Sequence, residues 1–129
     1  MSAPSPEPTV RSSNSATPEG TTLYVYRDEQ LMPGQSWKTN RSTMIMQADG
    51  NLVLRDENGR ALWHSGTVGT GYRAIMQADG NLVVYNKDNW GVWSTGTARH
   101  DGAVLCLQGD GNVAVVYQGQ IIWSTGTQR

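Results

Sequence analysis

Four polar side chains, Gln77, Asp79, Asn81 and Tyr85, lie at alternate or near-alternate positions along one short stretch of the chain. Side chains on a β-strand alternate between its two faces, so Asn81, Val83 and Tyr85 share one face. Gln77 and Asp79 lie before them, at an Asp-Gly step that favours a tight hairpin turn. A sugar hydroxyl both donates and accepts hydrogen bonds, and amides, a carboxylate and a phenol can serve both roles while Val83 contacts a C–H surface. The stretch therefore predicts a site for a polyhydroxylated ligand.

Turn formation offers a second explanation for part of this stretch. Asp, Gly and Asn are common in tight turns whatever a protein does. Turn chemistry, however, demands neither Gln77 before the turn nor Val83 and Tyr85 at alternate positions after it. We therefore favour ligand binding over turn formation alone as the reason for the whole pattern.

The same pattern occurs three times in the chain. The Gln, Asp and Asn of the first copy lie thirty residues before those of the second, and the Gln, Asp and Asn of the third copy lie thirty-one residues after them. The candidate binding residues are Gln47, Asp49, Asn51 and Val53 in the first copy, Gln77, Asp79, Asn81, Val83 and Tyr85 in the second, and Gln108, Asp110 and Asn112 in the third.

The three copies are not equally complete. Arg55 in the first copy stands where the second has a tyrosine, and arginine is longer and charged. In the third copy, Ala114 and Val116 stand where the second copy has its valine and its tyrosine. Tyr117 comes one residue late, which sends it to the opposite face unless a bulge corrects the register. We therefore expect the second site to bind most strongly, the first to be weakened and the third to be nearly silent.

A repeated closing sequence shows that the period is structural. Trp63, Trp93 and Trp123 each begin a Trp-x-x-Gly-Thr segment at a constant spacing of thirty residues. Units of this kind need their neighbours to bury their apolar faces, and three units suggest a pseudo-threefold prism with one sheet per side. We expect the three tryptophans to be buried together near its axis. Trp37 and Trp90 do not follow the period, so a surface or interface role stays open for both.

The composition predicts an all-β protein. The chain has 129 residues, enough for one domain, with fifteen glycines, five tryptophans, five tyrosines and no phenylalanine. Within the second unit we expect strands near residues 72–77, 81–86 and 91–95. The Pro- and Ser-rich residues 1–20 are expected to form a disordered tail, which leaves residues 21–129 as the folded domain.

The charge and the reactive residues argue against several function classes. The formal net charge is -1 and Lys and Arg do not cluster, so the footprint of a nucleic-acid-binding protein is missing. Cys106 is the single cysteine and is expected to pack as a small hydrophobe, while His64 and His100 are expected at the surface. Neither a nucleophile with its base nor a ligand pattern for a metal emerges, so we expect no enzyme, no metal and no cofactor.

The apolar runs are short. Residues 1–20 contain no hydrophobic region of the kind found in signal peptides, and the longest apolar run, Val113 to Tyr117, is too short to span a bilayer. We therefore expect no membrane insertion, and a cytoplasmic location or release without a signal.

The pattern Gln-x-Asp-x-Asn-x-Val-x-Tyr resembles the motif of the bulb-type mannose-binding lectins, the monocot or snowdrop-type family. The resemblance covers about residues 21–129, which would form a bulb-type lectin domain, and it implies a type II β-prism of three four-stranded antiparallel sheets with pseudo-threefold symmetry. It also implies metal-independent, shallow sites for mannose or mannosylated glycans. In such a site Asp79 and Asn81 bind the 2-hydroxyl, Gln77 the 3-hydroxyl and Tyr85 the 4-hydroxyl.

The resemblance has further implications and leaves alternatives. Plant members carry a disulfide with a cysteine where Gly50 stands here, and its absence resembles the bacterial or fungal branch. Family members often dimerise by exchanging the C-terminal strand, which residues 121–124 could do, giving a homodimer. Two other functions stay open: a protein-interaction or bacteriocin-type targeting module with partly decayed sugar sites, and a purely structural repeat.

Overall fold

The computed structural model describes residues 21–129, so the expected tail lies outside the described residues. Within that range the chain forms strands and no helix, which confirms the all-β prediction. The strands are β1 (Leu23–Val25), β2 (Gln30–Leu31), β3 (Ser36–Lys38), β4 (Ser42–Met46), β5 (Leu52–Asp56), β6 (Ala61–His64), β7 (Arg73–Met76), β8 (Leu82–Tyr85), β9 (Gly91–Ser94), β10 (Val104–Leu107), β11 (Val113–Tyr117) and β12 (Gln120–Ser124). None of these residues belongs to a helix that could cross a membrane.

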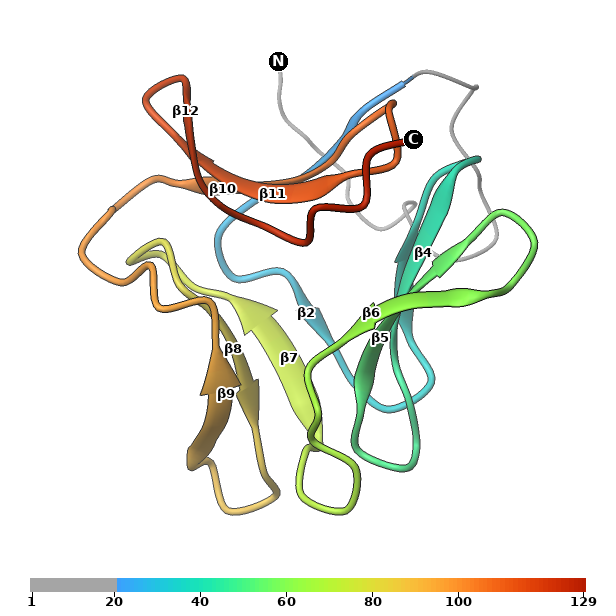
Figure 1. Ribbon diagram of the computed structural model, residues 1–129. Helices are drawn as coiled ribbons and strands as arrows, with labels where there is room; N and C mark the ends of the chain where they lie inside the picture. Colours follow the sequence, from blue (N-terminus) through green and yellow to red (C-terminus); the bar gives the residue numbers. More distant parts are fainter. Residues whose placement is uncertain (1–20) are drawn as a thin grey trace.

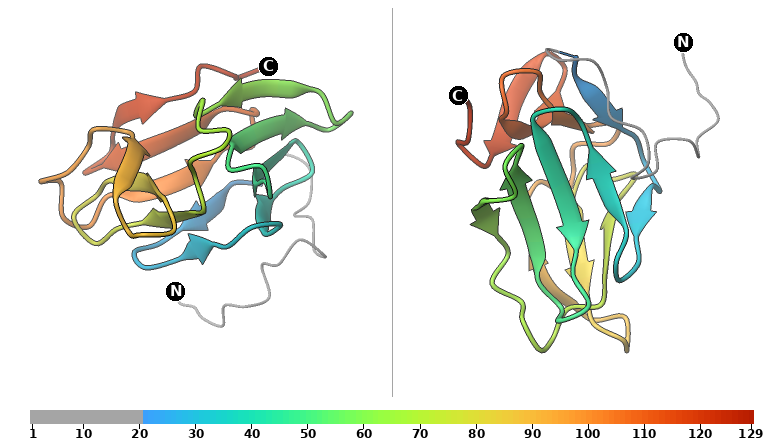
Figure 2. Two further views of the ribbon diagram at one scale, coloured as in Figure 1. Left: turned by 90° about the horizontal axis from the view of Figure 1, so that it is seen from below. Right: turned by 90° about the vertical axis from the view of Figure 1, so that its right-hand side faces the viewer.

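The strands form three four-stranded antiparallel sheets around one core (Figure 1). We name them by the repeat that supplies three of their strands: the first-repeat sheet (β3-β4-β5-β6), the second-repeat sheet (β2-β7-β8-β9) and the third-repeat sheet (β1-β10-β11-β12). The fourth strand of the third-repeat sheet is β1, from the beginning of the described chain. The two views of Figure 2 show the sheets as the sides of a prism, and its right-hand panel looks onto the outer face of the first-repeat sheet.

Alternation along the hairpins divides each sheet into an inner and an outer face. In the second-repeat sheet, β7 and β8 pair symmetrically about the Asp79-Gly80 step, so Met76 lies opposite Leu82 and Ala74 opposite Val84. All four of these side chains are fully buried. Their counterparts in the other two sheets are buried as well, and together they form one hydrophobic core. The bounds of β7, β8 and β9 differ by at most one residue from those expected for the second unit.

The three periodic tryptophans meet inside the prism. Their ring centroids are 5.3 Å apart for Trp63 and Trp93, 5.6 Å for Trp63 and Trp123, and 5.9 Å for Trp93 and Trp123, all in edge-to-face geometry. The expected cluster is confirmed, but its members are partly rather than fully buried, since each comes from the last strand of its sheet. Trp37 is 3% exposed and belongs to the core, whereas Trp90 is 72% exposed.

Ion pairs join the end of the chain to the first-repeat sheet. Glu57 lies 3.1 Å from Nε of Arg41 and 3.2 Å from Nη2 of Arg129. Backbone hydrogen bonding at Glu57 itself, opposed by partial desolvation and reinforced by Arg129 and Arg41, lowers the pKa of this carboxyl. Arg129 also donates through its backbone N–H to the carbonyl of Asp110, 2.7 Å away, which fastens the last residue to the turn of the third repeat.

Candidate functional site

The polar residues of the second repeat form one connected group on the outer face of their sheet. Gln77 donates from Nε2 to Oδ1 of Asp79 at 3.1 Å, and the phenol of Tyr85 donates to Oε1 of Gln77. Together with Asn81, Val83 and residues of β9, Gln77 and Tyr85 line an open hollow of about 490 Å³. The structure thus brings Gln77, Asn81, Val83 and Tyr85 together at one hollow, with Asp79 bonded to Gln77, and ligand binding at this place stays a prediction.

Several hydrogen-bonding groups of this patch are unused among the described residues. Asn81 uses only its side-chain oxygen, which accepts from Oγ1 of Thr95 and from the backbone N–H of Thr97, both at 3.0 Å. Its Nδ2 has no partner within residues 21–129, and neither has Oδ2 of Asp79. One donor and one acceptor of the motif thus remain unused, and a hydroxyl group can both accept from such a donor and donate to such an acceptor.

Part of the motif has a structural role, which includes the turn formation considered from the sequence and also bonds to the closing segment that the sequence reasoning missed. In each repeat Oδ1 of the Asp accepts from the backbone N–H of the Asn two residues later, at 3.0 Å for Asp49 and Asn51, 3.0 Å for Asp79 and Asn81, and 2.9 Å for Asp110 and Asn112. The side-chain oxygen of each Asn then accepts from the closing segment of its own repeat: from Ser65, Gly66 and Thr67, from Thr95 and Thr97, and from Thr125, Gly126 and Thr127. The Asp and Asn therefore hold the fold in every repeat, and their presence alone does not indicate binding.

The closing threonine completes this lock and explains the spacing between motif and closer. Oγ1 of Thr97 donates to the carbonyl of Gly80 at 2.6 Å, and Thr67 and Thr127 make the same bond in their repeats at 2.6 and 2.8 Å. Gly80 has φ +92°, and a Cβ there would lie 2.4 Å from the carbonyl oxygen of His100. Glycine is required at this turn because the next segment packs directly on its backbone.

In the first repeat, Arg55 takes the place of the tyrosine. With the Gln47 amide oriented to suit its neighbours, its Nε2 donates to Oδ1 of Asp49 at 3.1 Å and its Oε1 accepts from Nη2 of Arg55 at 2.9 Å. The guanidinium thus replaces the phenol as the donor to glutamine. Nδ2 of Asn51 lies 3.4 Å from Nδ1 of the exposed His64, so the amide that stays free in the second repeat has a neighbour here.

In the third repeat, the outer face is apolar where the second repeat is polar. Ala114 and Val116 occupy the positions of Val83 and Tyr85. Tyr117 packs against the hydrophobic core and lies edge-to-face with His100 at 4.9 Å, so the bulge between Val115 and Val116 does not return it to the outer face. All three sheets have a bulge at the equivalent position, and it moves the register of the last strand instead.

One neighbour of the second site was missed although the hairpin register could have revealed it. Arg73 lies opposite Tyr85 on β7, and its guanidinium carbon is 4.6 Å from the centre of the phenol ring. Its two Nη atoms donate to Gln30 at 3.2 Å and to Asn89 at 3.3 Å. Arg73 thereby supports the ring of Tyr85 from the side away from β9.

The reactive residues offer little for catalysis or metal binding. Cys106 is 5% exposed, and burial raises the pKa of its thiol to about 11, so the group is protonated at neutral pH. Nδ1 of His100 donates to the carbonyl oxygens of Thr97 and Ala98, at 2.9 and 3.0 Å, rather than facing a nucleophile. Among residues 21–129, no three His, Cys, Asp or Glu side chains lie close enough together to hold a metal ion.

Three antiparallel sheets around one core, with a polar hollow on an outer face, place the protein in the class of β-prism lectins. No protein-family model and no curated protein matches the chain. Solved structures do. A monomeric monocot mannose-binding lectin from Gastrodia elata is 39% identical, with 84% of this chain and 98% of that chain covered and a TM-score of 0.72.

Two further structures support the same conclusion. The mannose-specific agglutinin from snowdrop (Galanthus nivalis), solved with methyl-α-D-mannoside, is 38% identical, with 84% and 97% of the two chains covered and a TM-score of 0.65. A Marasmius oreades lectin is 28% identical, with 87% and 95% covered and a TM-score of 0.73. The chain belongs to the bulb-type lectin family, and the predicted type II β-prism is confirmed. That it comes from the bacterial or fungal branch stays a prediction.

Proposed function

We propose that the protein is a lectin that binds mannose or mannosylated glycans, chiefly through the second-repeat site. The observation that carries this proposal is that Nδ2 of Asn81 and Oδ2 of Asp79 have no partner within residues 21–129, in the motif that also contains Gln77 and Tyr85. Fold requirements explain the Asp and the Asn, but they do not explain Gln77, Val83 and Tyr85. The bulb-type lectins with similar structures are mannose-binding by their descriptions, which supports the same ligand here.

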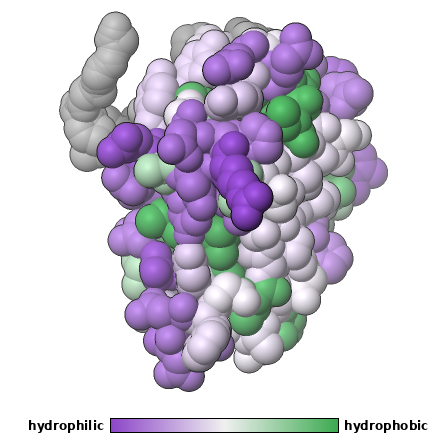
Figure 3. Space-filling view, turned by 90° about the vertical axis from the view of Figure 1, so that its left-hand side faces the viewer, coloured by the Kyte–Doolittle hydropathy of each residue, from purple (hydrophilic) through white to green (hydrophobic). Residues whose placement is uncertain are grey.

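The proposed binding is weak and independent of metal ions. Four or five hydrogen bonds contribute about 0.5–1.5 kcal/mol each before ordering costs are subtracted, which gives a dissociation constant on the order of millimolar. Direct bonds from side chains to hydroxyls need no cation. The face seen in Figure 3 carries small hydrophobic patches separated by hydrophilic residues, as suits a polar ligand better than a broad apolar partner.

A titration with methyl α-mannoside, followed by NMR, tests the proposal. The methyl resonances of Val83 are expected to shift first, with or without a chelator such as EDTA. Unchanged resonances at millimolar mannoside would refute mannose binding, and loss of the shifts in EDTA would refute metal independence.

A homodimer that exchanges β12 remains part of the proposal. In the single chain β12 pairs with β11 of its own sheet and supplies Trp123 to the tryptophan cluster. An exchanged strand would make the same contacts with a second copy, and several sites on one particle would raise avidity. Sedimentation equilibrium measures the mass directly, and a strict monomer at all concentrations would remove this part.

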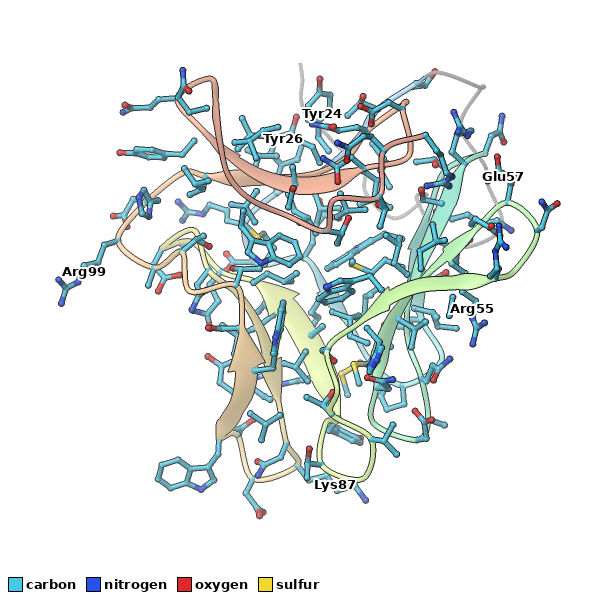
Figure 4. All side chains as sticks on the ribbon, in the orientation of Figure 1. Tyr24, Tyr26, Arg55, Glu57, Lys87 and Arg99 are labelled. Atoms are coloured by element: carbon cyan, nitrogen blue, oxygen red, sulfur yellow. The ribbon has the colours of Figure 1, made fainter. Side chains whose placement is uncertain are left out.

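A protein-interaction role is a second candidate because of the third-repeat sheet. Its outer side exposes Tyr24, Tyr26 and Ile121, which are 49%, 43% and 54% exposed, and Figure 4 shows the two tyrosines there. The same face has lost the sugar-binding valine and tyrosine. A glycan array tests the two candidates. If the wild-type protein binds glycans and Ile121→Asp binds them equally well, sugar recognition does not involve the outer side of the third-repeat sheet. If the wild-type protein binds no glycan, this second candidate is favoured.

A further inference from the structure

A row of three side chains crosses the outer face of the first-repeat sheet. Lys38 on β3 lies opposite Thr43 on β4, and Thr43 lies opposite Arg55 on β5. Residues directly opposite on neighbouring strands point to the same side of a sheet. The preceding row, Trp37 with Met44 and Leu54, is buried, so the row with the two cations faces outward.

This row lines a hollow separate from the one in the second repeat. The hollow has a volume of about 460 Å³, and its walls include Lys38, Asn40, Thr43 and Arg55. Figure 4 shows Arg55 on the outer side of its sheet, directed away from the core. Neighbouring strands are about 4.8 Å apart, so the backbones of Lys38 and Arg55 are roughly 10 Å apart, within reach of two long side chains.

The cations of this row have no carboxylate partner within residues 21–129. The two acidic residues at the hollow are engaged elsewhere. Oδ1 of Asp56 accepts from the backbone N–H groups of Asn58 and Arg60, both at 2.9 Å, and its Oδ2 lies 3.5 Å from Nε of Arg60. Glu57 pairs with Arg41 and Arg129, as described above. Lys38 and Arg55 are therefore the two charged groups of this hollow that form no ion pair within the described chain.

Arg55 is held in place and still has donors to spare. Its Nη1 donates to the carbonyl of Gly59 at 2.9 Å, and its Nη2 donates to Gln47. A guanidinium has five N–H groups, so three remain for a ligand. Lys38 adds an ammonium that makes no hydrogen bond within residues 21–129, and Thr43 adds a hydroxyl between the two.

The same row in the other repeats has a different chemistry. In the second-repeat sheet Arg73 is the only cation, and it is already bonded to Gln30 and Asn89 beside Tyr85. In the third-repeat sheet the row contains Val104 and Val116, both apolar. Two cations without carboxylate partners are thus particular to the first repeat, which also keeps Gln47, Asp49, Asn51 and Val53.

We propose that the first-repeat site binds an anionic saccharide, whose carboxylate, phosphate or sulfate group lies between Arg55 and Lys38 and accepts a hydrogen bond from Thr43. The sugar ring would lie over Val53, with its hydroxyls toward Asp49 and Asn51. Charge-assisted bonds to a guanidinium and an ammonium are stronger than neutral ones, so the anion compensates for the missing phenol. This inference rests on the proposed sugar-binding function and gives the first site its own ligand class.

An NMR titration with glucuronate and with mannose 6-phosphate tests the proposal. Both acidic sugars are expected to shift the Thr43 and Val53 resonances at concentrations that leave those of Val83 unchanged, and added salt is expected to weaken the effect. Methyl α-mannoside is expected to do the reverse. Because Val83 reports on neutral mannoside independently, failure of this inference is distinguishable from failure of the proposed function.

Substitutions in the row provide the second arm. Lys38→Met and Arg55→Gln each remove one charge-assisted contact at a half-buried position and are expected to weaken binding of the acidic sugars about tenfold. Lys87→Met is the matched control, since Lys87 lies on the β8–β9 hairpin of another sheet, at the bottom of Figure 4, whereas Arg55 lies at its right-hand side. Equal affinity in Lys38→Met and the parent protein would overturn the proposal.

A further titration distinguishes binding of a free anion from binding of an acidic saccharide. Inorganic phosphate is expected to shift Thr43 only at concentrations about tenfold higher than mannose 6-phosphate, because it cannot contact Asp49 and Asn51. If inorganic phosphate binds as tightly as mannose 6-phosphate, the site recognises an anion alone and the proposal is overturned. Silence of Thr43 and Val53 toward both acidic sugars overturns it as well.

Discussion

Replacement of Asn112 by alanine should destabilise the fold although it lies in the repeat that is least suited to bind sugar. Asn112 is 6% exposed, and its Oδ1 accepts from Oγ1 of Thr125 at 3.2 Å and from the N–H groups of Gly126 and Thr127 at 3.0 and 3.2 Å. Asn112→Ala leaves these two backbone donors without an acceptor. The penalty of about 1–3 kcal/mol for a donor without a partner applies in full only to buried groups, and Gly126 is exposed while Thr127 is half-buried, so the free energy of unfolding should fall by roughly 1–2 kcal/mol.

The change should be visible in thermal unfolding followed by circular dichroism. At roughly 4 °C per kcal/mol for a domain of this size, the midpoint Tm should fall by about 4–8 °C. Asn58→Ala makes the same chemical change at an exposed turn position and should leave Tm within about 2 °C of the parent, since surface changes stay within ±0.5 kcal/mol.

The same reasoning separates fold from binding in the second repeat. Asn81→Ala should also lower Tm, so its loss of mannoside binding would not isolate the amide donor. Asn81→Asp keeps an oxygen for Thr95 and Thr97 but replaces the donor Nδ2 by a second, charged acceptor oxygen, and should weaken binding with a smaller loss of stability. If Asn112→Ala and Asn81→Ala both unfold at the parental Tm, the lock between motif and closing segment does not stabilise the fold and the reasoning is refuted.

Three further outcomes follow from the structure. Tyr85→Phe removes the donor to Gln77 and should weaken methyl mannoside binding two- to tenfold, roughly 0.5–1.5 kcal/mol, in an NMR titration in which Tyr26→Phe behaves like the parent. Burial raises the pKa of Cys106 from its usual 9.0 to about 11, so the folded state binds the thiol proton more tightly than the unfolded state. The free energy of unfolding should therefore fall as the pH rises from 9 to 11. Cys106→Ala should remove this part of the pH dependence, as measured by urea titrations. Because the pKa of Glu57 is below its usual 4.5, the stability that this carboxylate contributes is present above pH 4.5 and is lost as the pH falls through the lowered pKa. Glu57→Gln should therefore reduce the dependence of the free energy of unfolding on pH in that range. An unchanged pH dependence would show that the pairs of Glu57 with Arg41 and Arg129 add nothing to stability.

Much of the fold follows from local patterns in the chain. The Asp-Gly step sets the register of each hairpin, and alternation about it assigns Leu82 and Val84 to the core and Val83 and Tyr85 to the outer face. The constant spacing of the tryptophans predicts their meeting, because equivalent positions in three similar sheets lie at equal distances from one axis. These inferences need only neighbouring residues and a repeat, so the sequence suffices for them.

The role of the motif asparagine could not be inferred in this way. Its side-chain oxygen bonds to Thr97 in the second repeat, sixteen residues further along the chain, and this partner is visible only once the strands are assembled. The same limit applies to Trp37, which breaks the period and yet is buried because β3 pairs with β4 and turns it inward.

What the sequence by itself determined is the set of hairpins, their faces and the residues that each repeat presents. What only the tertiary structure decided is which groups remain free for a ligand. Oδ1 of Asn81 is committed to Thr95 and Thr97 while its Nδ2 is open, and Lys38 joins Arg55 in one hollow because β3 lies beside β4. Donors and acceptors of the motif bond to partners that are distant in sequence. The donors and acceptors that remain free for a ligand are therefore a property of the assembled prism rather than of any one strand.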